Sequence, residues 1–330
     1  MDDLLDRMTR ARLPWTSPRL REWYDEARVT AQLRHYLETE AGRVGDATFG
    51  TEFRDAVDPA ISTDPLSWAN RVLDVGAGGW AVTGIRYRSL DRARPFVDVV
   101  ATDQDPTTDG LAWVADAVLP AYQAFGPLCL RVEAAHPDDL VTTMAADSRF
   151  GPGSAVDQYV LAGLVSDLRG APFEGDLVEL RPGEPAVMAA LAAAIYAQHP
   201  TGAALMATPE DESSLAECAA EDLLFQVVLD GVAVGMIAAV RDDAHGLSGF
   251  CVQEICLDPS VRGRGLAGHA MRGLLLRLPA RDGDVLWGTI HPANSPSLRN
   301  ALSVGREIVG GYVWVVPAGL SGMGDRYPDR

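Results

Sequence analysis

A short loop at residues 262–268, RGRGLAG, combines two arginines with three glycines between a strand-like apolar segment and an amphipathic helix. Glycine lets the main chain curl until successive N–H groups converge, and the following helix adds its free N-terminal N–H groups and positive dipole end. Arg262 and Arg264 could neutralise the charge of a bound anion. The loop is therefore predicted to bind a pyrophosphate, although the same letters also fit a tight strand-to-helix turn without a ligand.

The second half of the chain predicts the strand and the helix that the loop needs. Asp230-Gly231 is a typical hairpin turn between two strand-like segments. After the loop, Met271, Leu274 and Leu278 recur at helical spacing. The expected strands are 223–231, 232–243, 250–259, 285–290 and 308–316, and the expected helices are 266–278 and 295–304.

The first half repeats this order of elements. Pro106 matches Pro259 and His136 matches His291, at offsets of 153 and 155 residues. A hairpin, a strand, a helix, a strand and a helix recurring at a nearly constant offset predict an internal duplication. The glycine- and charge-containing segment 167–176 is expected to link the two copies. Residues 1–45 have a helical pattern and belong to neither copy, so they could pack on the first copy or contact a partner.

The stretch 176–317 resembles a complete N-acyltransferase domain of the GNAT superfamily, and the chain as a whole resembles a tandem GNAT protein. The resemblance implies an α/β (α+β) fold with a mixed, mostly antiparallel sheet flanked by helices. It also implies that the sheet opens after the strand before the loop and admits the pantetheine of acetyl-CoA or another acyl-CoA. The matching positions are Arg262, Gly265 and Ala267 in the loop and Asn294 and Ser297 at the start of the next helix.

The resemblance also implies which residues contact the acyl-CoA. The diphosphate would accept hydrogen bonds from the loop, the pantetheine would lie along the main chain of the preceding strand, and Asn294 would face the cofactor arm. The expected cofactor-binding residues are Ile255, Leu257, Arg262, Gly263, Arg264, Gly265, Leu266, Ala267, Gly268 and Asn294.

The first copy lacks the charge pattern for phosphate binding. Alignment through the two prolines places Asp109 opposite Arg262, so that a carboxylate would repel a phosphate. We therefore expect residues 1–168 to form a degenerate GNAT-like domain with extra N-terminal helices, and residues 176–330 to form the catalytic domain. The degenerate copy could serve as a scaffold, as the surface of a homodimer or as a wall of the acceptor site.

A second interpretation of the first half is a methyltransferase. The segment RVLDVGAGG, residues 71–79, resembles the first glycine-rich motif of S-adenosylmethionine-dependent methyltransferases, with Asp103 as the ribose-binding acid. However, the residues after the glycines alternate like a strand, whereas that motif requires a helix there. The spacing from Asp74 to Asp103 also exceeds the usual interval of about 20 residues.

Acyl transfer to an amine needs a base, because a protonated amine has no lone pair with which to attack a thioester. Glu254 lies in the strand before the loop, beside the expected thioester, and His291 follows the next strand. Strand alternation or a bulge could turn Glu254 away, and the repeat of His291 as His136 suits a structural His-Pro turn. Cys251 and Gln253 would share a face and could line the acceptor side.

The general acid is not assigned by the sequence. Many GNAT enzymes have a tyrosine seven residues after the helix-opening asparagine, and this chain has Ala301 there. Ser303 or Tyr312 could replace it, or the thiolate could leave unassisted because a thiol pKa is already modest.

Composition limits the partners. The chain has a net charge of −18 and all of its basic residues are arginines, which argues against a nucleic-acid partner and favours a cationic acceptor. Acceptor specificity is expected in 187–222, where an acidic run could recruit an amine or form a solvated helix face: Glu210, Asp211, Glu212, Glu217, Glu221 and Asp222. Four scattered cysteines predict no metal site, and the absence of a long apolar run or a leader predicts a cytoplasmic protein without a membrane partner.

The sequence therefore predicts a transferase: an N-acetyltransferase, or another acyltransferase, that moves an acetyl or short acyl group from CoA directly to a primary amine. The acceptor would be a small metabolite or antibiotic-like molecule, with a cationic one favoured by charge. Two alternatives remain, a non-catalytic acyl-CoA-binding or assembly protein and S-adenosylmethionine-dependent methyl transfer by the first half.

Overall fold

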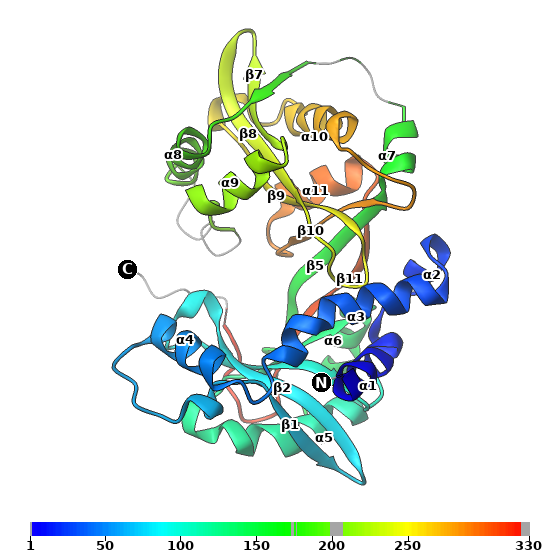
Figure 1. Ribbon diagram of the computed structural model, residues 1–330, viewed down its shortest axis with the longest axis vertical. Coiled ribbons are helices and arrows are strands. Elements are labelled where there is room, and N and C mark those ends of the chain that lie inside the picture. Colours follow the sequence, from blue (N-terminus) through cyan, green and yellow to red (C-terminus); the bar gives the residue numbers. More distant parts are fainter. Residues whose placement is uncertain (1, 173–174, 176, 199–206, 325–330) are drawn as a thin grey trace. The chain divides into compact units, whose positions relative to one another are not determined.

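A computed structural model describes residues 2–172, 175, 177–198 and 207–324. They form two compact units, and the chain passes between the units more than once (Figure 1). The first unit contains the described residues up to 158, the short segment 244–246 and residues from 310 onward. The second contains the described residues of 159–243 and 247–309. Asp176, where we expect the catalytic domain to begin, lies outside the described residues.

The sheet of the first unit runs in the order β1-β2-β3-β4-β11. β3 and β4 are parallel, and the other neighbours are antiparallel. Its strands are β1 Arg71–Gly76, β2 Gly79–Tyr87, β3 Pro95–Thr102, β4 Leu130–Ala134 and β11 Glu307–Val315. Its α-helices are α1 Asp2–Arg12, α2 Leu20–Trp23, α3 Glu26–Gly42, α4 Ala47–Val57, α5 Thr108–Val118 and α6 Pro137–Ala145. Short 3₁₀ helices lie at Leu13–Trp15, Pro65–Ser67, Arg88–Leu90 and Leu119–Phe125.

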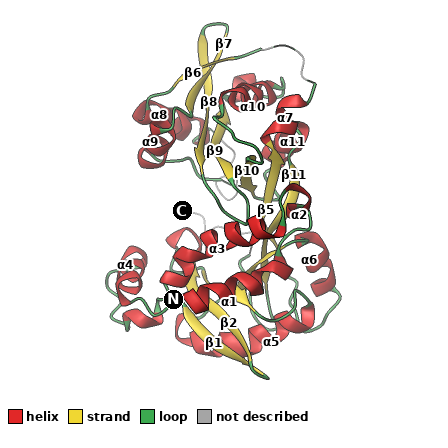
Figure 2. Cartoon of the chain, turned by 45° about the vertical axis from the view of Figure 1, so that its right-hand side comes forward, coloured by secondary structure: helices red, strands yellow, loops and turns green. Residues whose placement is uncertain are grey.

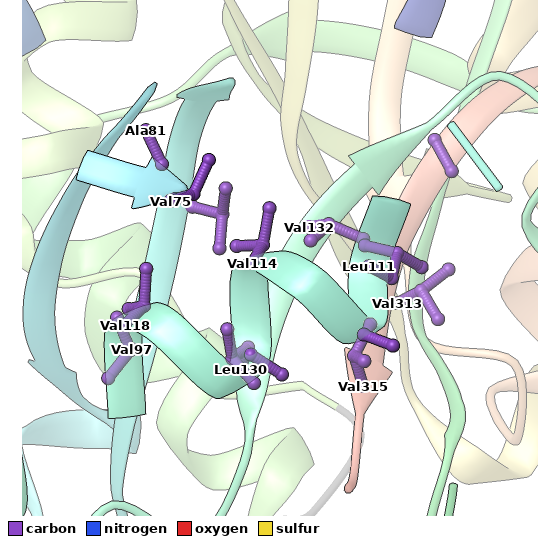
Figure 3. Close-up of a cluster of buried hydrophobic side chains, with 14 of the residues drawn as sticks. Val75, Ala81, Val97, Leu111, Val114, Val118, Leu130, Val132, Val313 and Val315 are labelled. Atoms are coloured by element: carbon purple, nitrogen blue, oxygen red, sulfur yellow. The ribbon is translucent and has the colours of Figure 1, made fainter. Parts of the chain in front are cut away.

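Helix α5 packs its apolar face on this sheet. Leu111, Val114 and Val118 are at most 1% exposed, and their spacing places them on one side of the helix. Figure 3 shows them in one cluster with Val313 and Val315 of β11. Burial of each such side chain contributes about 1.5–3 kcal/mol. Because Val313 and Val315 belong to this cluster, β11 is part of the first unit's core.

The sheet of the second unit runs in the order β6-β7-β8-β9-β10-β5. β9 and β10 are parallel, and the other neighbours are antiparallel. Its strands are β5 Ala155–Leu164, β6 Glu179–Pro182, β7 Leu224–Leu229, β8 Val232–Arg241, β9 Gly249–Leu257 and β10 Val285–Ile290. Its α-helices are α7 Val165–Gly170, α8 Pro185–Tyr196, α9 Glu212–Ala220, α10 Leu266–Arg277 and α11 Ser295–Ser303, and a 3₁₀ turn lies at Pro259–Val261.

Helices cover both faces of the second sheet. Both views show α8 and α9 on one side of β8 and β9, and α10 on the other (Figure 2). Met236 and Cys256 point to the side of α8 and α9, whereas Ile237 and Leu257 pack with α10. The predicted mixed, mostly antiparallel sheet flanked by helices is therefore confirmed. In the part of the chain that the structure describes, no helix combines the length and the apolar character needed to span a membrane.

The Asp230-Gly231 hairpin is also confirmed. The pair joins β7 to β8, and both residues have positive φ, 50° and 81°. Positive φ at both central residues is typical of a type I′ turn, whose twist matches that of the flanking strands. Glycine adopts this backbone without strain, which explains why the signal is readable in the sequence.

The last strands of the two halves are exchanged between the units. Residues 159–164 of β5 pair with β10, so a strand from the first half completes the second sheet. Residues 311–315 of β11 pair with β4 and complete the first sheet. The predicted domains 1–168 and 176–330 would contain β5 and β11 respectively. The boundaries of the compact units instead fall within these two strands. Each half of the chain thus supplies a strand to the other.

In the first unit, side chains from the N-terminal segment fill the place where β3 and β4 separate. The parallel pairing of these strands ends at Val99 and Val132, and the small cavity beyond is lined by Arg12, Trp15 and Glu133. An Arg12 Nη2 atom lies 2.8 Å from a Glu133 carboxylate oxygen. The N-terminal segment therefore packs on the first unit at the place where β3 and β4 separate.

Replacing Arg12 by methionine is expected to destabilise the first unit by about 3 kcal/mol, because it leaves a buried carboxylate without its main partner. Burial opposes the charge of Glu133, but Arg12 and His245 lower the pKa of Glu133 to about 2. The stabilisation is present above the ordinary value of 4.5 and is lost as the pH falls toward about 2. Urea unfolding at neutral pH measures the loss. Arg10→Met removes an exposed charge from the same helix, and an equal loss in that control would contradict the assignment.

The glycine-rich segment of the first unit does not form the turn that a methyltransferase needs. β1 ends at Gly76 and β2 begins at Gly79, so the glycines turn into an antiparallel strand rather than a helix. Asp103 accepts a hydrogen bond from the Trp80 N–H at 2.8 Å and so holds this hairpin against the end of β3. These contacts weigh against the methyltransferase alternative.

Candidate active site

The predicted pyrophosphate loop connects β9 to α10 through an exposed turn. Gly263 and Gly265 have φ values of 73° and 76°, in the left-handed region that glycine adopts without strain. No side chain caps the N-terminus of α10 at Gly265. Within the described residues, the N–H groups of residues 263–267 have no hydrogen-bond partner. Adjacent unpaired N–H groups at a helix N-terminus are suited to binding an anion.

The charges around the loop also favour an anion. Arg262 donates from Nε to the carbonyl oxygen of Leu257 at 3.1 Å and so ties the loop to the end of β9. Arg264 is exposed, and the first turn of α10 carries no acidic residue. In the first unit, by contrast, the Thr107 side chain accepts the N–H of Gly110 and caps α5 itself. This difference supports the prediction that only the later loop binds a diphosphate.

β9 and β10 separate beyond Cys251 and Trp287. Their parallel pairing stops at these two residues, although both strands continue. We call the place where they separate the β9–β10 fork. From residue 252 to 257, the β10-facing edge of β9 has no strand partner in the described part of the chain, so its main-chain groups could pair with an extended ligand. Ile255 and Leu257, the predicted pantetheine contacts, lie on this part of the strand.

A β-bulge at Gln253 decides where Glu254 points. β8 pairs with Val252 and then with Glu254, so Gln253 is an extra residue in β9. Val252 and Ile255 consequently pack with α10, while Cys256 packs with α8 and α9. Glu254 points to the side of α8 and α9. The bulge breaks the strict alternation on which the expected shared face of Cys251 and Gln253 depended.

Glu254 is a buried carboxylate, 4% exposed, that accepts two hydrogen bonds. The Tyr196 hydroxyl lies 3.1 Å from Oε1, and the Glu210 N–H lies 3.4 Å from Oε2. Burial raises the pKa of Glu254 to about 7, although both hydrogen bonds lower it. A carboxyl group that titrates near neutral pH is suited to general-base catalysis. Sequence analysis missed Tyr196, whose only signal is one hydroxyl at the end of the apolar helix α8.

The acidic run before and within α9 is divided between several roles. Glu210 is half-buried beside Glu254, and burial raises the pKa of Glu210. Asp211 caps α9, and Glu221 accepts the N–H of Arg241 at 2.8 Å. Glu212, Glu217 and Asp222 are exposed. The run is thus partly a solvated helix face, and Glu210 is the one of these residues that lies beside the candidate base Glu254. Residues 199–206 of the expected acceptor region lie outside the described residues.

His291 and Asn294 both hold the turn into α11. His291 Nδ1 accepts the N–H of Ala293 at 3.1 Å, and Asn294 Oδ1 accepts the N–H of Ser297 at 3.3 Å. These contacts account for the His-Pro turn and for the start of the helix. The catalytic role of His291 and the cofactor contact of Asn294 stay predictions.

Ala301 occupies the position at which many GNAT enzymes have a tyrosine. Ala301 is fully buried in α11 against Ile290, and Tyr159 of the exchanged strand β5, which pairs with Ile290, packs on the same cluster. The Ser303 hydroxyl donates to a carbonyl of its own helix. Tyr312 belongs to the first unit, because the exchange of β11 pairs it with β4.

No metal-binding cluster is present among the described residues, taking three or more histidine, cysteine, aspartate or glutamate side chains as the requirement. The four cysteines are free and buried. Burial raises the pKa of Cys129 and of Cys218 to about 12, so these thiols are neutral at physiological pH.

Comparison with known proteins assigns the second unit to a family. Residues 192–305 match the model of the acetyltransferase (GNAT) family, and this match includes β9, the loop and α10. Residues 192–305 therefore form a domain of the GNAT acetyltransferase family. The search of curated proteins finds no match.

The comparison with solved structures finds several matches of low identity. A GNAT-family acetyltransferase from Colwellia psychrerythraea is 12% identical, with 72% of this chain and 81% of that chain covered and a TM-score of 0.46. A GCN5-related N-acetyltransferase from Sphaerobacter thermophilus is 14% identical, with 84% and 92% covered and a TM-score of 0.45. AAC(6')-Iy in complex with the bisubstrate analog CoA-S-monomethyl-acetylneamine is 21% identical, with 40% and 92% covered and a TM-score of 0.31.

Proposed function

We propose that the second unit transfers an acyl group from an acyl-CoA to the primary amine of a small molecule. One observation carries the proposal. A single strand, β9, leads from the β9–β10 fork past the buried carboxylate of Glu254 to the loop of unpaired N–H groups at 263–267. An acyl-CoA needs these features in this order, because its acyl group, thioester and diphosphate follow one another along an extended arm.

Glu254 accepts the proton of the acceptor amine, directly or through a water molecule. The amine nitrogen attacks the thioester carbonyl carbon, the new C–N bond forms, and the C–S bond breaks. CoA leaves as a thiolate, and the amine proton goes to Glu254. Tyr196 orients the carboxylate through its hydrogen bond and keeps the pKa of Glu254 from rising further. Tyr196 is therefore a positioning residue.

The leaving thiolate needs little assistance, because a thiol pKa of about 8.5 is close to neutral pH. Ala301 is consistent with a reaction that proceeds without a general acid at that position. Tyr159 packs on the same cluster as Ala301, although it belongs to the first half of the sequence.

The acceptor approaches from the side of α8 and α9, because Glu254 points there. Glu210 adds a second carboxyl group beside Glu254, and the chain carries a net charge of −18. A cationic amine of a small metabolite or antibiotic-like molecule fits this charge, and a nucleic acid does not. We propose that the first unit acts as a scaffold, since Arg12 and Trp15 line the place where its parallel strands β3 and β4 separate and leave only a small cavity there.

A panel of amines tests the proposal through release of free CoA from acetyl-CoA, detected with a thiol reagent. Release that depends on one class of amine, with the acyl group recovered on nitrogen, is the expected result. Tight binding of acyl-CoA without release for any amine would instead favour a non-catalytic acyl-CoA-binding or assembly protein. Stabilisation of the protein by S-adenosylmethionine, and not by CoA, would favour the methyltransferase alternative.

A further inference from the structure

Arg306 is a buried cation without a partner among the residues that the structure describes. It is 4% exposed, and its Nε and Nη1 atoms are buried with no hydrogen-bond partner in the described part of the chain. It precedes β11, at the end of the turn that follows α11. Burying an unpaired charge costs several kcal/mol, so side chains of this kind normally have a counter-ion or a ligand.

The guanidinium lies at the β9–β10 fork. A Cβ atom built on Gly288 would lie 3.4 Å from Arg306 Nη1 and 3.5 Å from the Val252 carbonyl oxygen. Gly288 and Val252 are the first residues of β10 and β9 beyond the last pair of the two strands. The missing side chain of Gly288 therefore leaves room for a guanidinium at the closed end of the fork.

The described part of the chain supplies no negative charge there. Among the described residues, the titratable side chain whose charge affects the pKa of Arg306 is the Cys251 thiol. Burial raises the pKa of Cys251 well above its ordinary value, so this thiol is neutral. Burial also lowers the pKa of Arg306 to about 10, which still leaves it protonated at neutral pH. Glu254 points to the other side of the sheet, where it accepts the hydrogen bonds of Tyr196 and Glu210.

We propose that Arg306 binds the terminal carboxylate of the acyl group, so that the preferred cosubstrate is a dicarboxylic acid monothioester of CoA, such as succinyl-CoA. This inference rests on the proposed function. With the diphosphate at the loop and the thioester level with Glu254, the acyl chain points toward Val252. These two residues are two positions apart, which at roughly 3.3 Å per residue gives at most about 6.6 Å along the strand, because the bulge at Gln253 shortens it. A succinyl chain spans this distance, whereas an acetyl group does not.

The order of groups along β9 favours an acyl carboxylate over the leaving thiolate as the anion. The sulfur lies between the thioester carbonyl and the diphosphate, and hence on the loop side of Glu254, while Arg306 lies on the opposite side. The carboxylate is unchanged in the reaction. The amine displaces CoA as before, and the product is an amide with a free carboxylate.

Calorimetric titration of the full chain with succinyl-CoA and with butyryl-CoA, a neutral thioester of similar chain length, tests the assignment. The wild type is expected to bind succinyl-CoA at least about tenfold more tightly, as for a hydrogen-bonded charge pair. Arg306→Met is expected to remove this preference and to bind butyryl-CoA as the wild type does. Arg281→Met, which removes an exposed arginine of the same unit, should keep the preference.

Equal affinity of the wild type for both thioesters, or a preference that persists in Arg306→Met, would overturn the inference while leaving the proposed function intact. Failure of CoA and of every thioester to bind would instead overturn the proposed function. Arg306→Lys provides a second variant that keeps the charge, and it should retain part of the preference. Thermal unfolding without ligand adds an independent readout: Arg306→Met should be at least as stable as the wild type, because it removes an unpaired buried charge.

Discussion

Replacement of Gly265 by valine is expected to raise the dissociation constant for acyl-CoA by at least about 100-fold. Gly265 has a φ of 76°, which a β-branched residue adopts only with strain, so the loop must change its path. A different path separates the N–H groups of residues 263–267, which we propose bind the diphosphate. No atom lies within 4 Å of a Cβ built on Gly265, so the loss arises from the backbone and not from a clash. Calorimetry with acetyl-CoA measures it.

Gly126 provides the matched control for this variant. Its φ is 62°, and a Cβ built on it also meets no atom within 4 Å, but it lies in the first unit. Gly126→Val therefore introduces the same kind of strain without touching the loop, and it should bind acyl-CoA as the wild type does. A folded Gly265→Val protein that binds acyl-CoA with wild-type affinity would remove the loop from the cofactor site.

Replacement of Glu254 by glutamine is expected to lower kcat by about 10²–10⁴-fold while the affinity for acyl-CoA stays unchanged. Glutamine has the same shape and still accepts the Tyr196 hydroxyl, but it cannot take up a proton. In the wild type, kcat/KM should rise with pH through about 7, because Glu254 must be ionised to act as a base. Stopped assays of CoA release across pH 5–9 measure both effects.

Two further variants separate catalysis by Glu254 from nonspecific electrostatics. Glu217→Gln removes an exposed carboxylate on α9 and should leave the rate and its pH dependence unchanged. Tyr196→Phe removes a hydrogen bond that lowers the pKa of Glu254, so the rise of the rate should move to higher pH. A Glu254→Gln enzyme with wild-type kcat, or an unchanged profile in Tyr196→Phe, would exclude Glu254 as the base.

The same pKa shift predicts a stability difference. The folded-state pKa of Glu254, about 7, lies above the ordinary value of 4.5, so the folded protein binds the extra proton between these pH values. The wild type therefore loses stability relative to Glu254→Gln as the pH rises from about 4.5 to about 7, and this difference persists at higher pH. Urea unfolding of both proteins at pH 5 and pH 8 measures the difference.

Local patterns in the sequence predicted the elements that carry the candidate cofactor loop. The Asp230-Gly231 turn is readable because two consecutive positive φ values require residues of this type. The helix after Gly265 is readable because its apolar residues recur at helical spacing. Both signals depend on neighbouring residues alone. For this reason the strand, the loop and the helix were predicted in their observed order.

The sequence could not predict contacts between residues far apart in the chain. The exchange of β5 and β11 depends on which sheet edge each strand meets, and both strands are apolar enough to complete either sheet. The Gln253 bulge depends on the register with β8, and one extra residue is enough to turn Glu254 toward Tyr196. Alternation in β9 alone could not decide the direction of that carboxylate.

The sequence by itself predicted the GNAT-like domain and the candidate loop, because glycine conformation, arginine charge and helical period are properties of adjacent residues. The tertiary structure alone decided three other features: the burial of Glu254, the burial of Arg12 beside Glu133, and the place of Arg306 beside Gly288. The physical reason is that burial is a property of the packed chain. The same carboxylate or guanidinium is an ordinary solvated ion on the surface and a reactive or ligand-binding group in the interior.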